Sequence, residues 1–177
     1  MNRIFLIGYM GSGKTTVGQL LATKLGYSFI DMDTHIESKL FKSVSQIFAE
    51  LGEQQFRLLE HQCLHEIAEF NNAVISTGGG VPCFFDNMKY MNEHGITIYL
   101  KLTAEELTER LEGFQANKRP LLAGKKGKEL YQFIAEGLAK REPFYSQATY
   151  YVSGEIESMV SEVCEMVKSD NPSRKVL

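Results

Sequence analysis

The chain has 177 residues, of which 44% are hydrophobic and 23% are charged, and its net charge at pH 7 is −3. These values are typical of one soluble domain that buries a core. The slight negative charge argues against a general affinity for nucleic acid or for a membrane surface, so any phosphate must be bound by local geometry. The three cysteines are far apart and form no C-x-x-C motif, as expected of a reduced protein.

Neither a membrane span nor a targeting segment is expected. No apolar stretch approaches the ~18 residues that cross a bilayer, and the first residues lack the charged-then-apolar layout of a signal peptide. We therefore expect a cytoplasmic monomer that acts on small molecules, without a nucleic-acid or membrane partner.

Short apolar runs alternate with helical patterns along the chain. The predicted strands are residues 3–7, 28–32, 73–76, 96–101 and 149–152. Such alternation predicts an α/β fold, a three-layer α/β/α sandwich with a five-stranded parallel sheet and helices on both faces. Ligands of such sheets bind at the carboxyl ends of the strands.

Two segments depart from simple alternation within a single predicted domain, residues 1–168. The stretch between the second and third strands is too long for one crossover helix, and we expect two or three helices there, with residues 33–62 forming a substrate-binding insertion. Residues 112–127 have no clear period and carry several cations, which is typical of a functional lid loop. Residues 169–177 are polar and are expected to form a tail.

The run Gly-Tyr-Met-Gly-Ser-Gly-Lys-Thr-Thr, residues 8–16, fits the spacing G-x-x-x-x-G-K-[ST]. It follows the first strand and precedes an amphipathic helical pattern, which is the context that a phosphate-binding loop requires. Glycines allow successive backbone N–H groups to converge on an anion at the helix N-terminus. In this arrangement Lys14 reaches the β- and γ-phosphates of a nucleotide, and the Thr15 hydroxyl can bind Mg²⁺.

Asp31 and Asp33 come at the end of the second predicted strand. Their i, i+2 spacing places both side chains on one face of an extended segment, next to the phosphate loop. One carboxylate can hold a metal ion and the other can accept the proton of an attacking hydroxyl. The alternative is that Asp33 caps the following helix.

Three consecutive glycines, Gly78, Gly79 and Gly80, directly follow the third strand. Bare backbone at the carboxyl end of a strand allows close approach of a ligand, whereas the alternative is a tight strand-to-helix turn. Three glycines, where a turn needs two, favour a ligand.

Arginines pair with carboxylates and phosphates in two-pronged geometry, which lysine does less well. Arg57 lies in the helical insertion, Arg119 precedes a Pro-Leu-Leu run in the predicted lid, and Arg141 ends a helical pattern before the fifth strand. The alternative for each is a solvated surface ion pair. His61 and His65 are four residues apart on a predicted helix, but no third ligand follows, so we expect no metal there.

Taken together, these motifs resemble the shikimate kinases over about residues 3–165. The resemblance rests on the phosphate loop and on Asp-x-Asp at 31–33, Phe-Arg-x-x-Glu at 56–60, Gly-Gly-Gly-Val at 78–81, Arg-Pro-Leu-Leu at 119–122 and Arg-x-x-x-Tyr at 141–145. It implies a P-loop kinase that transfers the γ-phosphoryl group of ATP to the 3-hydroxyl of shikimate, with Mg²⁺ as cofactor, in aromatic amino-acid biosynthesis.

The resemblance also implies roles for particular residues. It places shikimate at Asp33, Arg57, Gly79 and Arg141, and magnesium at Thr15 and, through water, Asp31. Asp33, Lys14 and Arg119 would carry the catalytic step. The implied ATP contacts are Gly11, Ser12, Gly13, Lys14, Thr15, Thr16 and Arg119.

One position departs from the family pattern. About seven residues before the Arg-Pro pair, where an arginine facing adenine is usual, this chain has Glu112, and Arg110 lies two residues earlier. Either Arg110 serves in its place or adenine is held otherwise; the loop 153–155 after the last strand is a further candidate.

Two other functions remain open at this point. A small P-loop kinase that acts on gluconate or on a nucleoside monophosphate would share the phosphate loop and would also recruit arginines. A nucleotide-binding switch without catalysis would keep the phosphate loop but would need no acceptor site.

Overall fold

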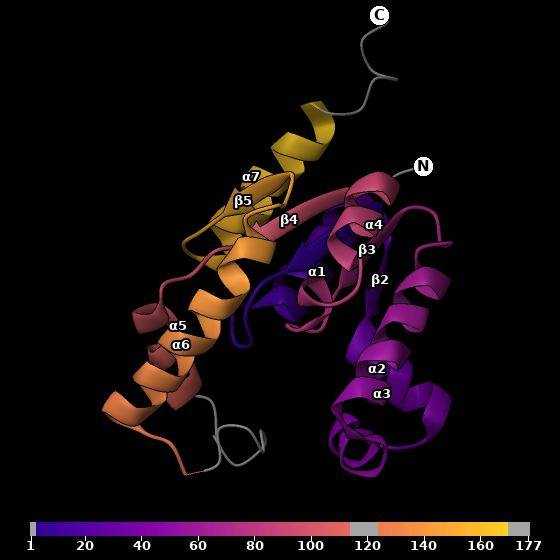
Figure 1. Cartoon of the computed structure of the whole chain (residues 1–177). Helices are drawn as coiled ribbons and strands as arrows, with labels where there is room; N and C mark the ends of the chain where they lie inside the picture. Colours follow the sequence, from indigo (N-terminus) through magenta and orange to yellow (C-terminus); the bar gives the residue numbers. More distant parts are fainter. Residues whose placement is uncertain (1–2, 114–123, 170–177) are drawn as a thin grey trace, which may run out of the picture.

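Five parallel strands form the centre of the protein (Figure 1), and the computed structural model describes residues 3–113 and 124–169 of the chain. Their order across the sheet is β2-β3-β1-β4-β5. The strands are β1 (Arg3–Ile7), β2 (Ser28–Asp31), β3 (Ala73–Ser76), β4 (Ile96–Leu100) and β5 (Tyr150–Val152). The predicted five-stranded parallel sheet is therefore confirmed, with ends that differ from the predicted ones by one residue for β2, β4 and β5.

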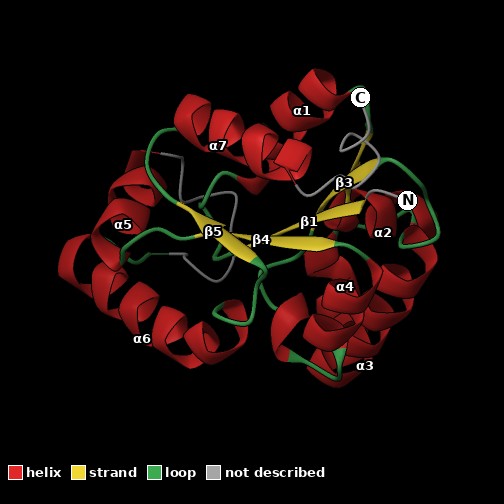
Figure 2. Cartoon of the chain, turned by 90° about the horizontal axis from the view of Figure 1, so that it is seen from above, coloured by secondary structure: helices red, strands yellow, loops and turns green. Residues whose placement is uncertain are grey.

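Helices cover both faces of the sheet. They are α1 (Lys14–Leu25), α2 (Met32–Leu40), α3 (Val44–Ile67), α4 (Asn87–His94), α5 (Ala104–Gly113), α6 (Gly127–Tyr145) and α7 (Ile156–Ser169), with a short 3₁₀ helix, η1 (Val81–Cys83). Figure 2 shows α1 and α7 on one side of the sheet, and α3, α4 and α6 on the other. The three-layer sandwich expected from the alternating pattern is thus present.

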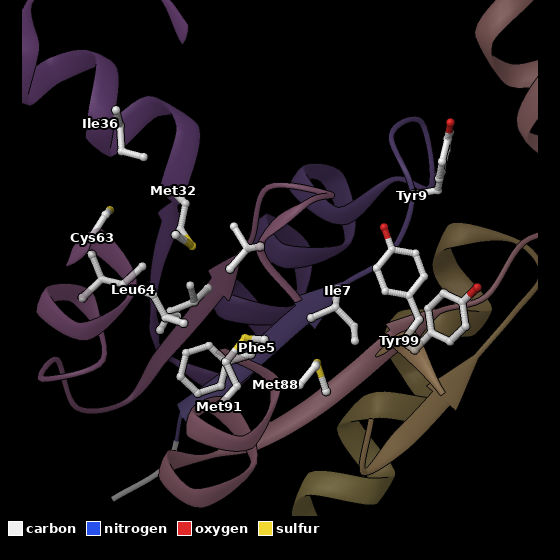
Figure 3. Close-up of a cluster of buried hydrophobic side chains, with 14 of the residues drawn as sticks. Phe5, Ile7, Tyr9, Met32, Ile36, Cys63, Leu64, Met88, Met91 and Tyr99 are labelled. Carbon is white, nitrogen blue, oxygen red and sulfur yellow. The ribbon is translucent and has the colours of Figure 1, made fainter. Parts of the chain in front are cut away.

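The central strand explains how one sheet supports two cores. All five residues of β1 are buried, and successive side chains point to opposite faces. Ile4 and Leu6 join the cluster under α1 and α7, whereas Phe5 and Ile7 join the larger cluster on the other face. Figure 3 shows Phe5 and Ile7 in this larger cluster. A strand that is buried on both faces reads as a continuous apolar run, which is why the sequence predicted it.

The long segment between β2 and β3 contains two helices and a kink. Helix α3 begins at a capping box formed by Ser43 and Gln46, and its helical geometry is broken at Gly52, where φ is 75° and ψ is 170°. A positive φ of this kind favours glycine. The expected two or three helices are therefore present, as α2 and the two parts of α3.

Parts of two predicted segments lie outside the described residues. The predicted lid, residues 112–127, is described only at its two ends, where α5 ends and α6 begins, so Arg119 lies outside the description. All but one residue of the predicted tail lies outside it as well. Within residues 3–113 and 124–169, no helix is long and apolar enough to cross a membrane.

Candidate active site

The order of the strands gathers three loops at one edge of the sheet. β1 pairs with β3, and β3 pairs with β2. Because parallel strands end at the same edge, the loop after β1, the glycine loop after β3 and the end of β2 lie next to one another. Thr77, directly after β3, holds the glycine loop against β1: its backbone N–H and its hydroxyl both donate to the carbonyl of Leu6 at 3.1 Å.

The phosphate loop joins β1 to the first residue of α1. Gly8, Gly11 and Gly13 have φ values of 145°, 83° and 94°, a region that strains any other residue. Lys14 begins α1, and its Nζ donates to the carbonyls of Gly8 at 2.8 Å and Tyr9 at 3.0 Å. The ammonium group therefore lies over the loop whose N–H groups and helix dipole favour an anion.

Thr15 and Asp31, the predicted metal-binding pair, are in direct contact. The Thr15 hydroxyl donates to Asp31 Oδ2 at 2.9 Å. The pair lines a hollow of about 460 Å³ between α1, β2 and α2. A hydroxyl and a carboxylate are hard oxygen donors, and Mg²⁺ is commonly held by one or two such groups together with water and substrate phosphates. The residues present therefore fit this ion, although the described residues contain no cluster of three acidic, histidine or cysteine ligands.

The Asp-x-Asp segment differs from the prediction in conformation. β2 ends at Asp31, and Asp33 lies in the first turn of α2, so the two carboxylates do not share one face of an extended strand. Asp31 is the helix cap: its Oδ1 accepts from the backbone N–H groups of Asp33 at 3.1 Å and Thr34 at 3.3 Å. The alternative that Asp33 caps the helix is therefore wrong, because Asp31 occupies the cap position and Asp33 already lies inside α2.

Each of the three glycines after β3 has a charged side chain against it. A Cβ atom built on Gly78 would lie 2.8 Å from Glu60 Oε1 and 3.2 Å from Asp33 Oδ1. A Cβ on Gly80 would lie 2.6 Å from Arg57 Nη1, and one on Gly79 would lie 3.3 Å from Arg141 Nη1. None of the three has a positive φ. Space for neighbouring side chains therefore explains these glycines.

Arg57 is held in a narrow environment on α3. Its Nη1 donates to Glu60 Oε2 at 2.6 Å and its Nη2 to Glu53 Oε1 at 3.3 Å. The guanidinium carbon lies 4.5 Å from the centroid of the Phe84 ring. Its Nε is buried and has no hydrogen-bond partner among the described residues. A buried donor without a partner is costly.

Glu60 is the last residue of the Phe-Arg-x-x-Glu pattern at 56–60, but the sequence alone indicated no role for it. Its side chain is 4% exposed and pairs with Arg57. Burial raises the pKa of this carboxyl from 4.5 to about 7, against the opposing effect of the Arg57 guanidinium. The i, i+3 spacing from Arg57 on one helix was the available signal, but its burial depends on the packing of α3 against the glycine loop.

Arg141 reaches the same glycine loop from α6. Its Nη1 lies 3.5 Å from the carbonyl oxygen of Gly79, and the Tyr145 hydroxyl donates to that oxygen at 2.5 Å. Tyr145 is fully buried. The structure therefore brings Asp33, Arg57, Arg141 and the three glycines together at the edge where the phosphate loop lies.

Arg110 lies beside the phosphate loop. Its Nη1 donates to the carbonyl of Ser12 and its Nη2 to the carbonyl of Gly154, both at 3.3 Å. Glu112 instead accepts a hydrogen bond from the backbone N–H of Gly127 at 2.6 Å, at the start of α6. Of the two residues, Arg110 is thus the one placed between the phosphate loop and the loop 153–155.

The histidines of α3 pack against aromatic rings. His61 Nδ1 lies 2.7 Å from Asn87 Oδ1, and the centroid of the His65 ring lies 3.8 Å from that of Tyr90. These contacts join α3 to α4.

A phosphate loop that opens a helix at the carboxyl edge of a parallel sheet, facing a second cluster of charged side chains, defines a P-loop kinase. The shikimate kinase family model matches residues 10–170. The shikimate kinase of Parabacteroides distasonis is 56% identical over 162 residues, 92% of each chain. The chain belongs to the shikimate kinase family, whose members are ATP-dependent phosphotransferases with an alcohol acceptor.

Two solved structures agree with this assignment. The crystal structure of shikimate kinase from Bacteroides thetaiotaomicron has a TM-score of 0.90 at 48% identity, covering 94% of this chain and 98% of that one. Shikimate kinase from Acinetobacter baumannii in complex with shikimate has a TM-score of 0.86 at 31% identity, covering 97% and 96%.

Proposed function

We propose that this site transfers the γ-phosphoryl group of ATP to the 3-hydroxyl of shikimate, forming shikimate 3-phosphate and ADP. The contact between the two loops carries the proposal. A Cβ on Gly79 would lie 3.3 Å from Arg141 Nη1, 3.4 Å from the Gly8 carbonyl and 3.6 Å from the Met10 N–H nitrogen. An acceptor that is held by Arg141 therefore lies next to the loop that holds the phosphates.

The phosphate loop is the proposed nucleotide site. The backbone N–H groups of residues 11–16 bind the phosphates, and Lys14 neutralises charge on the β- and γ-phosphates. Thr15 and, through water, Asp31 would hold Mg²⁺, which would supply positive charge to offset that of the phosphates. Arg119 in the predicted lid completes the charge neutralisation, and Arg110 lies on the adenine side.

The acceptor site is proposed around the three glycines. Arg57 and Arg141 bind the carboxylate of shikimate, since both guanidinium groups border the glycine loop and guanidinium groups pair with carboxylates in two-pronged geometry. The amides of Gly78, Gly79 and Gly80 offer further donors to ligand oxygens.

Asp33 accepts a hydrogen bond from the 3-hydroxyl. As the hydroxyl oxygen forms its bond to the γ-phosphorus, the bond from that phosphorus to the bridging oxygen of ADP breaks, and the hydroxyl proton passes to Asp33. The protein contributes mainly orientation and charge stabilisation, because the transition state of phosphoryl transfer is loose.

An acceptor panel tests the proposal. ADP release is measured with ATP and Mg²⁺ in the presence of shikimate, gluconate, AMP or CMP, with Lys14→Met as the control that lacks the phosphate-loop cation. We expect turnover with shikimate alone, and its loss in the control. Turnover with gluconate or a nucleotide, but not with shikimate, would refute the assignment, and ATP binding without turnover on any acceptor would favour the switch function.

We also propose a cellular location and an oligomeric state for this protein. A biosynthetic enzyme without a membrane-spanning helix in its described residues fits the cytoplasm, where ATP and Mg²⁺ are available. For the oligomeric state we propose a monomer, which light scattering of the purified protein tests.

A further inference from the structure

Tyr9 lies inside the phosphate loop, yet its side chain belongs to the acceptor side of the molecule. The residue is 2% exposed and is part of the larger core cluster. Figure 3 shows it at the edge of this cluster, well away from Phe5 and Met91. The phosphate-loop pattern sets no residue type at this position, so phosphate binding does not explain a buried aromatic ring here.

The ring of Tyr9 supports the guanidinium of Arg141. The guanidinium carbon of Arg141 lies 4.8 Å from the centroid of the Tyr9 ring. A cation at this distance from the face of an aromatic ring is attracted by the ring quadrupole, and more strongly where water is excluded. The same guanidinium also contacts the glycine loop, where its Nη1 lies 3.5 Å from the Gly79 carbonyl oxygen, which is long for a hydrogen bond.

Helix α6 has a glycine where the ring needs room. Gly137 lies four residues before Arg141, so both residues fall on the same face of α6. A Cβ on Gly137 would lie 2.4 Å from the Tyr9 hydroxyl and 3.1 Å from the ring carbon that carries it. Glycine inside a helix lowers stability relative to alanine. Its presence here therefore matches the requirement for space beside the ring.

The backbone of the same tyrosine organises the phosphate loop. The Tyr9 carbonyl accepts from Lys14 Nζ at 3.0 Å and from the Ser12 N–H at 3.2 Å. The carbonyl of Tyr9 thus contacts the cation that faces the phosphates, and its ring contacts the cation that faces the acceptor. One residue joins the two halves of the site.

We propose that Tyr9 is a positioning residue for Arg141. Its ring packs against Gly137 and holds the guanidinium in the position in which it binds the carboxylate of the acceptor, next to the phosphate loop. This inference rests on the proposed function, in which Arg141 binds that carboxylate. It assigns Tyr9 no contact with the substrate.

The experiment combines Tyr9→Leu, Tyr9→Phe and Gly137→Ala with steady-state kinetics. We expect Tyr9→Leu to raise the KM for shikimate about 5- to 20-fold, as expected for a desolvated cation–π contact, while the KM for ATP stays within twofold. Tyr9→Phe keeps the ring, so its KM for shikimate should stay within twofold of that of the unaltered protein. Gly137→Ala should raise the KM for shikimate, because the added methyl displaces the ring. Tyr131→Leu, on the exposed part of α6, is the matched control.

A double-mutant cycle separates positioning from a general loss of structure. In an Arg141→Ala background, Tyr9→Leu should no longer change the KM for shikimate, since the group that it positions is absent. An equal effect in both backgrounds, or an unchanged shikimate KM in a folded Tyr9→Leu protein, would overturn the inference. If the unaltered protein fails to turn over shikimate, the proposed function itself is wrong, so the two failures are distinguishable.

Discussion

The substitution Gly80→Ala tests the acceptor site with the addition of one methyl group. Gly80 has φ −90° and ψ −23°, a conformation that alanine adopts without strain. The new Cβ would lie 2.6 Å from Arg57 Nη1 and 2.9 Å from Arg57 Cζ. Carbon atoms do not tolerate such distances, so the guanidinium must move away from the glycine loop.

The surroundings of Arg57 leave little room for that movement. Nη1 is held by Glu60 at 2.6 Å, one face of the guanidinium packs on Phe84, and the side chain is only 15% exposed. Displacement should cost one charge-assisted hydrogen bond to the acceptor carboxylate, worth about 1.5–3 kcal/mol. The KM for shikimate should therefore rise roughly 10- to 100-fold.

The effect on the free energy of unfolding should be small. Replacing glycine by alanine at a compatible conformation stabilises by about 0.4–1 kcal/mol through the unfolded chain, which offsets part of the steric cost. The assay is ADP release against shikimate concentration at saturating ATP, with the ATP KM and the thermal midpoint measured on the same protein. A folded Gly80→Ala protein with a shikimate KM within twofold of the original would refute the reasoning that Arg57 binds the acceptor.

Gly26→Ala is the matched control. Gly26 ends α1 with φ 69°, and a Cβ there would meet no heavy atom within 4 Å. Alanine in this left-handed conformation should destabilise the protein by roughly 1–2 kcal/mol and leave both KM values unchanged. The two variants are therefore complementary: Gly80→Ala should raise the shikimate KM with little change in stability, whereas Gly26→Ala should lower stability without changing either KM.

Three further predictions concern the carboxylates. Burial raises the pKa of Glu60 from 4.5 to about 7. Its contribution to the free energy of unfolding is therefore fully present below pH 4.5 and is lost as pH rises to 7, at about 1.4 kcal/mol per pH unit. Thermal melts of Glu60→Gln should show a flatter dependence of stability on pH over that range, and an unchanged dependence would contradict the raised pKa. Asp33→Asn should lower kcat for shikimate about 10²- to 10⁴-fold while ATP affinity, measured by calorimetry, is kept; near-normal turnover would remove Asp33 from the proton-accepting role. Asp31→Asn should keep the helix cap, since asparagine caps as well as aspartate, but should raise the Mg²⁺ concentration needed for half-maximal activity, and an unchanged Mg²⁺ requirement in this variant would exclude Asp31 from metal binding.

The features that the sequence predicted correctly depend on short-range rules. A strand such as Arg3–Ile7 is buried on both faces, so its apolar run identifies it without knowledge of its neighbours. The phosphate loop requires positive φ at Gly8, Gly11 and Gly13, and only glycine meets that requirement easily. The parallel sheet followed from the alternation of strands and helices.

The conformation of the Asp-x-Asp segment could not be read from its spacing. An i, i+2 pair lies on one face of a strand, but β2 stops at Asp31 because that side chain caps α2. Both residue types fit both conformations, so only the docking of α2 against α3 and β2 decided between them. The one-residue differences at the ends of β4 and β5 lie within the one or two residues by which assignments of element boundaries differ.

By itself, then, the amino-acid sequence determined the fold class, the phosphate loop and the family to which the chain belongs. The tertiary structure decided which distant residues meet: Arg57 and Glu60 with the glycine loop, and Tyr9 of the phosphate loop with Arg141 of α6. The physical reason is the range of the interactions. Backbone conformation and hydrophobic period are set within a few residues, whereas burial, pKa and cation–π contact depend on atoms that the fold brings together from far apart in the chain.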